Sequence, residues 1–402
     1  MRGYLIRFLA AGLPVLLLLA CFEVALRLFP ALIGIPILER FHPDLGAAIA
    51  EELGFSTKAS RLLISTADRL DKGPDFYISL ANSRYVAPID PVDVAYGGID
   101  YMPTDGLGFC NPPDAAARGY VDIVAIGGSV PNCAGVPPEH IFTNELARLT
   151  HTTVYNIGVA RTGPNEYLEL LRRYGLRFKP RVVVMNIAEA NDLRDISRYN
   201  QFVTEGVKQE SWTRNLGGLF RYSYAFAFLK GGIEFAVKAV KAALGPDFRY
   251  TVRAEGKDVA LNIGNSTRDE LQLAHQVAAG TVSPDIYGPA LKDFVTLAGK
   301  SGFTPVVVLV PAAYTIYDKS IVFNDPSIAP DIRAYHSLQR DWLAANAARI
   351  GYRFIDATAG MMAAAESGPL LYFPANVHLT AAGHAALAAT IAPELRSVLS
   401  VP

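Results

Sequence analysis

The strongest constraint on the fold is a series of five short apolar segments that begins at residue 121. They are rich in β-branched residues and comprise Val121–Ile126, Val154–Ile157, Val182–Ile187, Thr304–Val310 and Arg353–Ile355. Continuous apolar runs of this length suit strands that are buried on both faces of a parallel sheet. Helical patterns lie between them, at 139–149, 165–174, 287–300 and 334–350. This alternation predicts an α/β domain with a doubly wound, mainly parallel sheet flanked by helices.

Three polar residues stand where such a sheet binds ligands, which is beyond the carboxyl ends of its strands. Ser129 follows the first strand in Gly127-Gly128-Ser129, Asn191 follows the third strand, and His378 precedes the last helix, for which Thr380 is the predicted N-cap. A serine in such a turn can present its hydroxyl and its own N–H to one substrate atom, and a loop histidine can act as general base. Singly, each has another explanation, because Gly-Ser pairs form turns and a lone asparagine often caps the following helix.

Taken in chain order, these residues resemble the SGNH/GDSL hydrolase family. The segment 105–113, DGLGFCNPP, is similar to the one before the nucleophile in membrane-anchored bacterial members related to carbohydrate O-acetyl esterases and transferases, as are 173–175 and 179–180. The resemblance implies an SGNH or flavodoxin-like fold over residues 105–395. It also implies that Ser129 is the nucleophile, that His378 is the base, and that Ser129 N–H and the Asn191 side chain donate to an oxyanion.

The chain departs from the family pattern at three positions around this site. Gly128 replaces the aspartate of Gly-Asp-Ser, and Arg161 aligns with the glycine whose N–H is the third oxyanion donor. Any residue but proline keeps that N–H, so this donor is expected to survive. Asn376 stands two residues before His378, where related members have an aspartate. Asparagine can orient the ring but brings no charge to stabilise the imidazolium, and the corresponding change in a protease triad costs ~10⁴ in turnover.

Two functions are compatible with these departures. The first is an active esterase or acyltransferase for acyl groups, often acetyl, on carbohydrate or a small ester, in which a Ser–His dyad or a carboxylate such as Asp192 or Asp356 compensates for Asn376. The second is a catalytically weak or inactive domain that binds glycan or scaffolds an envelope assembly. Retention of Ser129, Asn191 and His378 favours the enzyme, because nucleophile and base dominate such catalysis.

The N-terminus has the order of charge and hydropathy that is typical of an export signal or membrane anchor. The basic segment Met1–Arg7 precedes the uncharged run Phe8–Phe22. Apolar residues resume after Glu23 and Arg27, which can pair at i,i+4 spacing, and this favours an uncleaved anchor over a cleaved signal. A lipoprotein is the third alternative, because residues 18–21 end in Cys21 like a lipobox. The interpretation is a bacterial protein tethered through residues 1–38, with its main domain in the periplasm or outside the cell.

The remaining chain divides into a lead-in segment, 39–119, that packs on the main domain, and the α/β domain itself, 120–402. In the lead-in segment, Ala47–Leu70 is predicted to be helical and Pro88–Pro113 to be loop. The α/β domain carries an aromatic-rich insertion at 195–285, which is predicted to be helical. This insertion would cap the site, touch the membrane or pack on the sheet.

Composition excludes several classes of function. The 37 basic and 38 acidic residues give a formal net charge of -1, so there is no electrostatic footprint for nucleic acid. Neither GxGxxG nor a P-loop follows the first strand, and no Cys/His cluster has zinc spacing, so neither cofactor nor metal is expected. Cys110 and Cys133 either form a disulfide, if they lie outside the cytoplasm, or remain two partly buried thiols.

Overall fold

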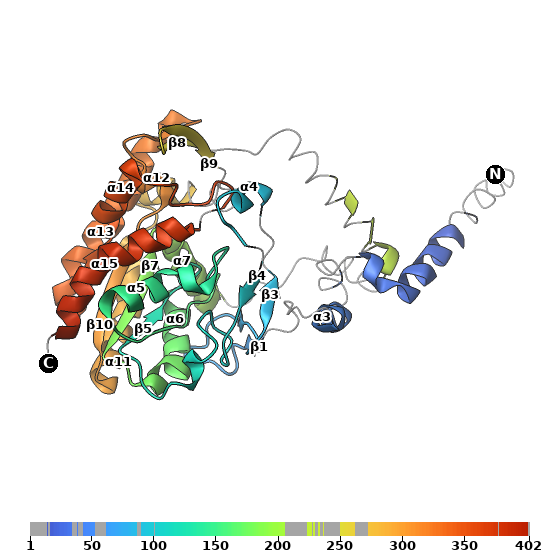
Figure 1. Cartoon of the computed structure of the whole chain (residues 1–402), viewed down its shortest axis with the longest axis horizontal. Coiled ribbons are helices and arrows are strands. Elements are labelled where there is room, and N and C mark those ends of the chain that lie inside the picture. The colour runs from blue at the N-terminus through green and yellow to red at the C-terminus, as the bar shows by residue number, and fades with distance from the viewer. Residues whose placement is uncertain are drawn as a thin grey trace. The chain divides into compact units, whose positions relative to one another are not determined.

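A computed structural model describes residues 14, 17–33, 38, 43–52, 62–86, 90–99, 101–205, 223–226, 228–229, 232–233, 236, 250–261, 272–376 and 378–400. The chain forms two compact units, which are described separately. One comprises Met1–Arg61 and Val207–Pro246, and the other comprises Leu62–Gly206 and Asp247–Pro402. The second unit contains the central sheet (Figure 1).

The central sheet has five parallel strands, as the apolar segments predicted. They are β5 (Ile123–Ile126), β6 (Val154–Asn156), β7 (Val182–Ala188), β10 (Thr304–Val310) and β12 (Arg353–Asp356), in the spatial order β12-β10-β7-β5-β6. Val182 of the central strand pairs with Ile123 on one side and Thr304 on the other. Every residue of β5, β6 and β7 is buried. Burial on both faces is the reason why these strands show no polar alternation in the sequence.

Two groups of helices cover this sheet (Figure 1). The first consists of α5 (Phe142–Thr150), α14 (Thr358–Ser367) and α15 (Ala381–Ser400), in which α15 contacts both others. The second consists of α6 (Pro164–Leu170), α7 (Asp192–Glu205), α11 (Tyr287–Ser301) and α13 (Ala329–Ile350), in which α11 contacts α6 and α13. Crossovers between parallel strands are right-handed. Because the chain steps from β5 to β6 in one direction and from β6 through β7 to β12 in the other, the two groups lie on opposite faces.

Each unit also contains shorter elements. In the first unit they are η1 (Pro30–Ile33) and α3 (Pro43–Glu52). In the second unit, the hairpin pairs are β1 (Leu62–Ile64) with β2 (Phe76–Ile78) and β3 (Arg84–Val86) with β4 (Tyr101–Pro103). The short helices are α4 (Pro91–Val94), η2 (Ala115–Ala117), η3 (Pro138–His140), the π-turn η4 (Leu171–Gly175), η5 (Leu176–Phe178), η6 (Pro284–Ile286), α12 (Ala313–Ile316) and η7 (Pro326–Ile328).

Two predictions of helix are wrong. The helix expected over Ala47–Leu70 ends at Glu52 in the described part of that segment, and Leu62–Ile64 is strand β1. The insertion is not purely helical, because β8 (Tyr250–Ala254) and β9 (Lys257–Leu261) form an antiparallel hairpin that β11 (Val322–Phe323) extends. The two residues between β8 and β9, Glu255 and Gly256, both have positive φ, as a tight hairpin turn of this kind requires.

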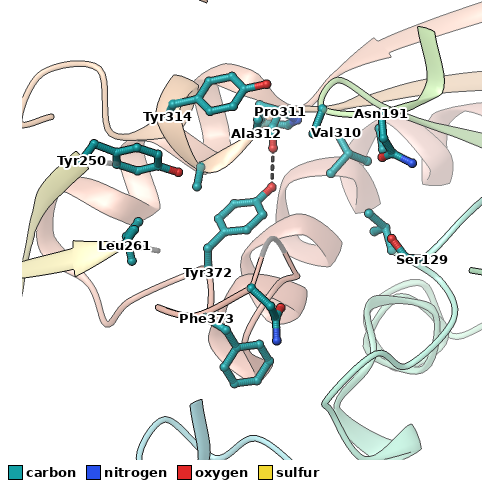
Figure 2. A pocket seen from close by; sticks show the side chains of 15 residues that line it. Ser129, Asn191, Tyr250, Leu261, Val310, Pro311, Ala312, Tyr314, Tyr372 and Phe373 are labelled. Atoms are coloured by element: carbon teal, nitrogen blue, oxygen red, sulfur yellow. Dashed lines mark hydrogen bonds between the residues drawn. The ribbon is translucent and has the colours of Figure 1, made fainter. Parts of the chain in front are cut away.

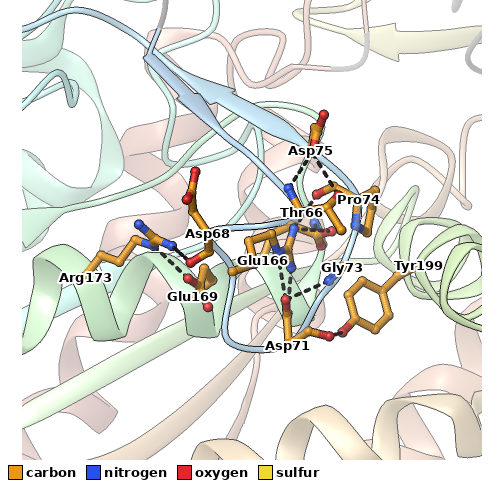
Figure 3. Close-up of polar contacts among 12 residues, drawn as sticks. Thr66, Asp68, Asp71, Gly73, Pro74, Asp75, Glu166, Glu169, Arg173 and Tyr199 are labelled. Carbon is orange, nitrogen blue, oxygen red and sulfur yellow. Dashed lines mark hydrogen bonds and ion pairs between the residues drawn. The ribbon is translucent and has the colours of Figure 1, made fainter.

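A buried arginine, Arg69, joins the lead-in segment to the helical layer through Asp71 and Glu166, which are labelled in Figure 3. The Arg69 guanidinium is 1% exposed and donates to both carboxylate oxygens of Asp71, at 2.7 and 2.6 Å, and to Pro74 O at 2.6 Å. It also forms an ion pair with Glu166 of α6 at 3.5 Å. Glu166 in turn accepts from Gly163 N–H, which closes the start of α6. Residues 62–78 are therefore held on the domain by a desolvated charge network.

This network predicts a large loss of stability on substitution of Arg69. Arg69→Ala leaves Asp71 and the buried Glu166 without their cation, and breaking a buried ion pair in this way costs about 3–5 kcal/mol. We expect a corresponding fall in the free energy of unfolding, measured by urea denaturation of the full chain. Arg148→Ala is the matched control, because Arg148 pairs with Glu145 on the surface, where such a pair contributes under about 1 kcal/mol. Equal effects of the two substitutions would contradict this account.

In the first unit, one carboxylate connects the N-terminal helical residues 17–28 with the insertion. Glu23 accepts from Arg27 Nε at 2.8 Å, which confirms the predicted i,i+4 pair. It also accepts from the N–H groups of Tyr224 and Ala225, at 3.0 and 2.8 Å, and from Ser223 Oγ at 3.0 Å. Within the described ranges, no helix combines the length and the apolar composition needed to cross a membrane. Residues 1–13, with the basic segment and the start of the apolar run, lie outside the described residues.

Candidate active site

A pocket lies beyond the carboxyl ends of β5, β7 and β10. The strands β5 and β7 are neighbours from which the chain departs in opposite directions, and open α/β sheets bind ligands at such a switch point. Its cavity volume is about 30 Å³. It is lined by Ser129, Val130, Ala188, Ala190, Asn191, Tyr250, Leu261, Val310, Pro311, Ala312, Ala313, Tyr314, Tyr372, Phe373 and Asn376. Two of the predicted site residues, Ser129 and Asn191, lie together on one side of it (Figure 2).

Two glycines let the chain turn sharply between β5 and Ser129. A Cβ at Gly127 would lie 2.8 Å from Pro131 Cγ, and a Cβ at Gly128 would lie 2.9 Å from Tyr167 Oη. Real Cβ atoms do not approach other atoms so closely, so both positions exclude a side chain. The Tyr167 hydroxyl thus occupies the space beside position 128, where the family pattern has its aspartate. Ser129 itself lies in a turn and is partly exposed to the pocket.

Hydrogen bonds through Asn156 connect the turn after Ser129 to the lead-in segment. Asn156, at the end of β6, donates from Nδ2 to the carbonyls of Cys110 and Pro131 and accepts from Gly158 N–H at 2.8 Å. The backbone N–H of Asn156 donates to Asn111 Oδ1 at 2.9 Å. The 105–113 segment that the family resemblance singled out therefore supports the loop that carries Ser129, and it does not enter the pocket-lining set.

A disulfide between Cys110 and Cys133 joins the same two segments, and their Cα atoms are 6.1 Å apart. Cross-linking a loop of this length, with a sequence separation of 23, stabilises a fold by about 3 kcal/mol through the entropy of the unfolded chain.

We therefore expect Cys110→Ser/Cys133→Ser to lower the free energy of unfolding by about that amount. Cys21→Ser is the matched control, because Cys21 is an exposed free thiol. Urea denaturation with and without a reducing agent measures both effects. The expectation would be contradicted if the reductant left the free energy of unfolding of wild type unchanged and the double variant were as stable as wild type.

Asn191 is placed to donate a hydrogen bond into the pocket. Its Nδ2 donates to Asp195 Oδ2 at 2.9 Å, which uses one of the two amide protons and leaves the other for a ligand. The turn that carries Asn191 is fixed by Asp192, a buried carboxylate that accepts from Tyr167 Oη at 2.8 Å and from Ala188 N–H at 3.0 Å. Burial raises the pKa of Asp192 well above its ordinary range.

Arg161, the third expected oxyanion donor, is not brought into the pocket lining. It lies in the turn before α6 with φ of 67° and an exposed side chain. The neighbouring carbonyl of Thr162 lies close to Gly128, so this turn packs beside the serine loop. Its role as an oxyanion donor stays a prediction.

His378 lies before α15, as the sequence predicted, in a small hairpin. Tyr372 and Leu379 form an antiparallel bridge, and Phe373 N–H donates to His378 O at 2.9 Å. Asn376 Oδ1 accepts from His378 N–H at 2.8 Å and lies 3.0 Å from His378 Nδ1. Asn376 thus contacts the imidazole as the sequence predicted. Burial lowers the pKa of His378 to about 4, so the ring is neutral at pH 7.

The carboxylate behind Asn376 is one that sequence analysis missed. Asn376 Nδ2 donates to Asp93 Oδ2 at 2.9 Å, and Ala375 N–H donates to Asp93 Oδ1 at 2.7 Å. Asp192 and Asp356, which were considered for this role, bond elsewhere: Asp356 accepts from Thr358 N–H at 2.9 Å. Asp93 stands in a segment predicted to be loop, 285 residues before His378, and the sequence holds no signal that joins the two.

Among the contacts of the described residues, no hydrogen bond joins Ser129 Oγ to His378, and the pocket lining includes Asn376 but not His378. The second histidine of this region, His384, is structural: it is buried and accepts at Nδ1 from Phe142 N–H at 3.2 Å. The helix α15 begins where Thr380 predicted, since Thr380 Oγ1 accepts from Gly383 N–H at 3.1 Å.

Aromatic side chains form the wall opposite Ser129 and Asn191. Tyr250 and Leu261, from the β8–β9 hairpin, lie at the far end of the pocket, and Tyr372 lies between them and Ser129 (Figure 2). Tyr372 Oη donates to Pro311 O. The insertion therefore contributes side chains to the pocket, which was one of the alternatives for it. The alternation of apolar and polar residues in Tyr250–Ala254, followed by Glu-Gly, was the available signal for this hairpin.

Comparisons with known proteins add only distant similarities. No protein-family model matches the chain, and no curated protein matches it. Among solved structures, an acetylxylan esterase from Geobacillus stearothermophilus is 11% identical, with a TM-score of 0.37 over 69% of this chain and 95% of its own. An extracellular lipase from Streptomyces rimosus is 14% identical, with a TM-score of 0.38 over 69% of this chain and 99% of its own. A protein assigned to the G-D-S-L lipolytic family, from Desulfitobacterium hafniense, is 12% identical, with a TM-score of 0.36 over 67% and 97%. The chemistry of the site rests on its own residues.

Proposed function

We propose that this chain is a serine ester hydrolase of the SGNH type that removes or transfers a short acyl group. The observation that carries the proposal is the meeting of Ser129, Asn191 and Asn376 in one pocket, with Ser129 and Asn191 at the ends of neighbouring strands and Asn376 hydrogen-bonded to His378. A nucleophile, an oxyanion donor and an oriented base are the three groups that acyl transfer requires.

In the proposed reaction, Ser129 Oγ attacks the ester carbonyl while its proton passes to His378 Nε2. The carbonyl oxygen becomes an oxyanion that accepts from Ser129 N–H and from the free Asn191 amide proton. The C–O bond to the alcohol then breaks, and the alcohol leaves with the proton from His378. Water, or a second hydroxyl in a transferase, attacks the acyl-serine, and Ser129 regains its proton. Catalytic hydrogen bonds are often long in unliganded enzymes and form in the substrate complex, so His378 is expected to close on Ser129 there.

The pocket wall supports a small acyl group and a carbohydrate acceptor as the substrate class. Tyr250, Tyr314 and Tyr372 enclose the end of the pocket away from Ser129, which limits the length of an acyl chain. Aromatic rings also provide flat apolar surfaces with a polar hydroxyl at the edge, which suits sugars. We expect acetyl esters to be hydrolysed faster than butyryl or longer esters.

The proposed location is outside the bacterial cytoplasm, with the chain tethered at its N-terminus. The Cys110–Cys133 disulfide supports an oxidising compartment, in which such bonds persist. The basic-then-apolar order of residues 1–22 supports an export signal or an anchor. Protease protection in spheroplasts tests both parts, because a tethered extracytoplasmic domain is degraded from outside and stays with the membrane fraction.

A second candidate function is a glycan-binding or scaffold domain without turnover. Two observations favour it. No hydrogen bond joins Ser129 to His378 among the described contacts, and the partner of His378, Asn376, is uncharged. On that reading, glycan binding survives the loss of the serine hydroxyl.

The test is covalent labelling of the full chain with a fluorophosphonate, followed by peptide mass spectrometry, beside hydrolysis of acetyl esters. We expect one adduct, on Ser129, and no adduct in His378→Ala. A folded wild-type protein that neither labels nor hydrolyses would reject the enzyme in favour of the scaffold, and binding of acetylated oligosaccharides would then be measured.

A further inference from the structure

We propose that Asp93 is a positioning residue for the base, which acts on His378 through the Asn376 amide. This inference rests on the proposed function, and it supplies the carboxylate that Asn376 lacks. The three side chains form one line of contacts, from the Asp93 carboxylate to the Asn376 amide at 2.9 Å, and from that amide to His378 Nδ1 at 3.0 Å.

The chemistry of the partners determines the direction of each hydrogen bond. Asp93 accepts from Ala375 N–H at 2.7 Å and faces the Asn376 amide with its other oxygen. An ionised carboxylate only accepts, so the NH₂ group of Asn376 must point to Asp93 and its oxygen to His378. That oxygen already accepts from His378 N–H at 2.8 Å and cannot donate, so Nδ1 carries a proton. The remaining nitrogen, Nε2, is then free to accept the proton of Ser129.

Asp93 is held rigidly and away from water, as a positioning group requires. It is 0% exposed, although its neighbours Val92 and Val94 on α4 are exposed. Its backbone carbonyl accepts from Tyr96 N–H and Gly98 N–H, both at 3.0 Å, which closes the turn after α4. A dry carboxylate polarises the amide in front of it more strongly than an exposed one does, and this strengthens the bond to the imidazole.

The turn after α4 also contacts the loop of the nucleophile. Ile99 N–H donates to Gly135 O at 3.0 Å, and Gly135 follows Ser129 and the disulfide-bonded Cys133 in the same stretch of chain. The α4 turn is therefore bonded on one side to the serine loop and on the other to the Asn376–His378 hairpin. This arrangement sets the position of the base relative to the nucleophile.

The line of contacts from Asp93 through Asn376 to His378 predicts how kcat depends on pH. Burial raises the pKa of Asp93 to about 6, with a smaller contribution from Asp90 and against the hydrogen bonds from Ala375 and Asn376. The titratable groups that face it are Asp90, the N-cap of α4, and His378 behind Asn376, since residues 129–135 hold no free titratable side chain. Both Asp93 and His378 must be deprotonated, and the Asp93 pKa is the higher of the two, so kcat is expected to fall as pH drops through about 6.

The experiment compares Asp93→Asn with the exchange Asp93→Asn/Asn376→Asp in the full chain. In the single variant, the side chain at position 93 has one oxygen and one NH₂ group, whereas both groups that face it, Ala375 N–H and Asn376 Nδ2, are donors. One donor therefore faces the NH₂ group, and the amide of Asn376 loses its fixed direction. We expect kcat for an acetyl ester to fall about 10²-fold, less than the ~10⁴ of a direct contact, with KM within about twofold. In the exchange, the amide introduced at 93 donates to the carboxylate introduced at 376, every bond is satisfied, and kcat is expected to return to within about threefold of wild type.

Two readouts separate positioning from a merely structural role. The acid limb of the kcat profile near pH 6 should disappear in Asp93→Asn, whereas Asp90→Asn, on the same turn, should keep the plateau kcat and move the limb to lower pH. Histidine-selective ¹⁵N NMR, with His378→Gln for assignment, should show the Nδ1–H form in wild type and a shift toward Nε2–H in Asp93→Asn. This second readout needs no turnover. It therefore tests whether Asp93 sets the tautomer of His378 even if the chain proves not to be an esterase.

Two results would overturn the inference. The first is a kcat for Asp93→Asn within twofold of wild type together with an unchanged tautomer of His378. The second is a loss of kcat in Asp93→Asn that comes with a lower melting temperature and that the exchange does not restore, since that result assigns Asp93 to holding the hairpin alone.

Discussion

Ser129→Ala is expected to reduce kcat for acetyl-ester hydrolysis by at least ~10⁴-fold, because removing the nucleophile of a serine hydrolase leaves only oxyanion stabilisation and binding. The hydroxyl lies at the pocket surface in a turn whose backbone is fixed by Gly127, Gly128 and the disulfide, so its removal leaves the fold intact. We therefore expect the melting temperature to change by less than 2 °C (about 0.5 kcal/mol or less for a surface substitution). Steady-state kinetics and a thermal scan of the full chain measure the two quantities.

Ser197→Ala is the matched control for loss of a hydroxyl. Ser197 lies on α7 and donates to the backbone carbonyl of Leu193, outside the pocket. Its kcat should equal that of wild type. If Ser129→Ala kept more than a tenth of the wild-type rate, Ser129 would not be the nucleophile, and the pocket would have to work without covalent catalysis.

Asn191→Ala is expected to lower kcat by ~10²–10³-fold, which is the usual effect of removing one oxyanion donor. Only the amide proton that does not bond Asp195 is available to the substrate, so the loss should appear in kcat and leave KM nearly unchanged. A ground-state contact would instead raise KM. Kinetics over a concentration series of an acetyl ester separates the two cases.

Asn346→Ala controls for the loss of an amide elsewhere in the domain, because Asn346 on α13 donates to Trp342 O and lies outside the pocket. An Asn191→Ala enzyme as fast as this control would remove Asn191 from the oxyanion site. Ser129 N–H and the backbone of Arg161 would then be the remaining candidates for that role.

The part of this protein that pattern alone predicted is the part with the simplest physical cause. The strands of the central sheet are buried on both faces, so each one appears as an unbroken apolar run, and all five were found within a few residues of their ends. The start of α15 was found for an equally local reason, the hydroxyl of Thr380. Elements with mixed burial were missed: β1 has two exposed residues in three, and β8 alternates buried with more exposed residues.

The sequence by itself determined the fold class and the meeting of Ser129 and Asn191, because a parallel sheet brings the ends of its strands to one edge wherever they stand in the chain. Only the tertiary structure decided what surrounds them. It brought Asp93 to Asn376 and Tyr250 to the pocket, and it left Arg161 outside the pocket lining. Such contacts depend on the path of loops and hairpins, which hydrophobic periodicity does not encode, so no spacing in the chain could have shown them.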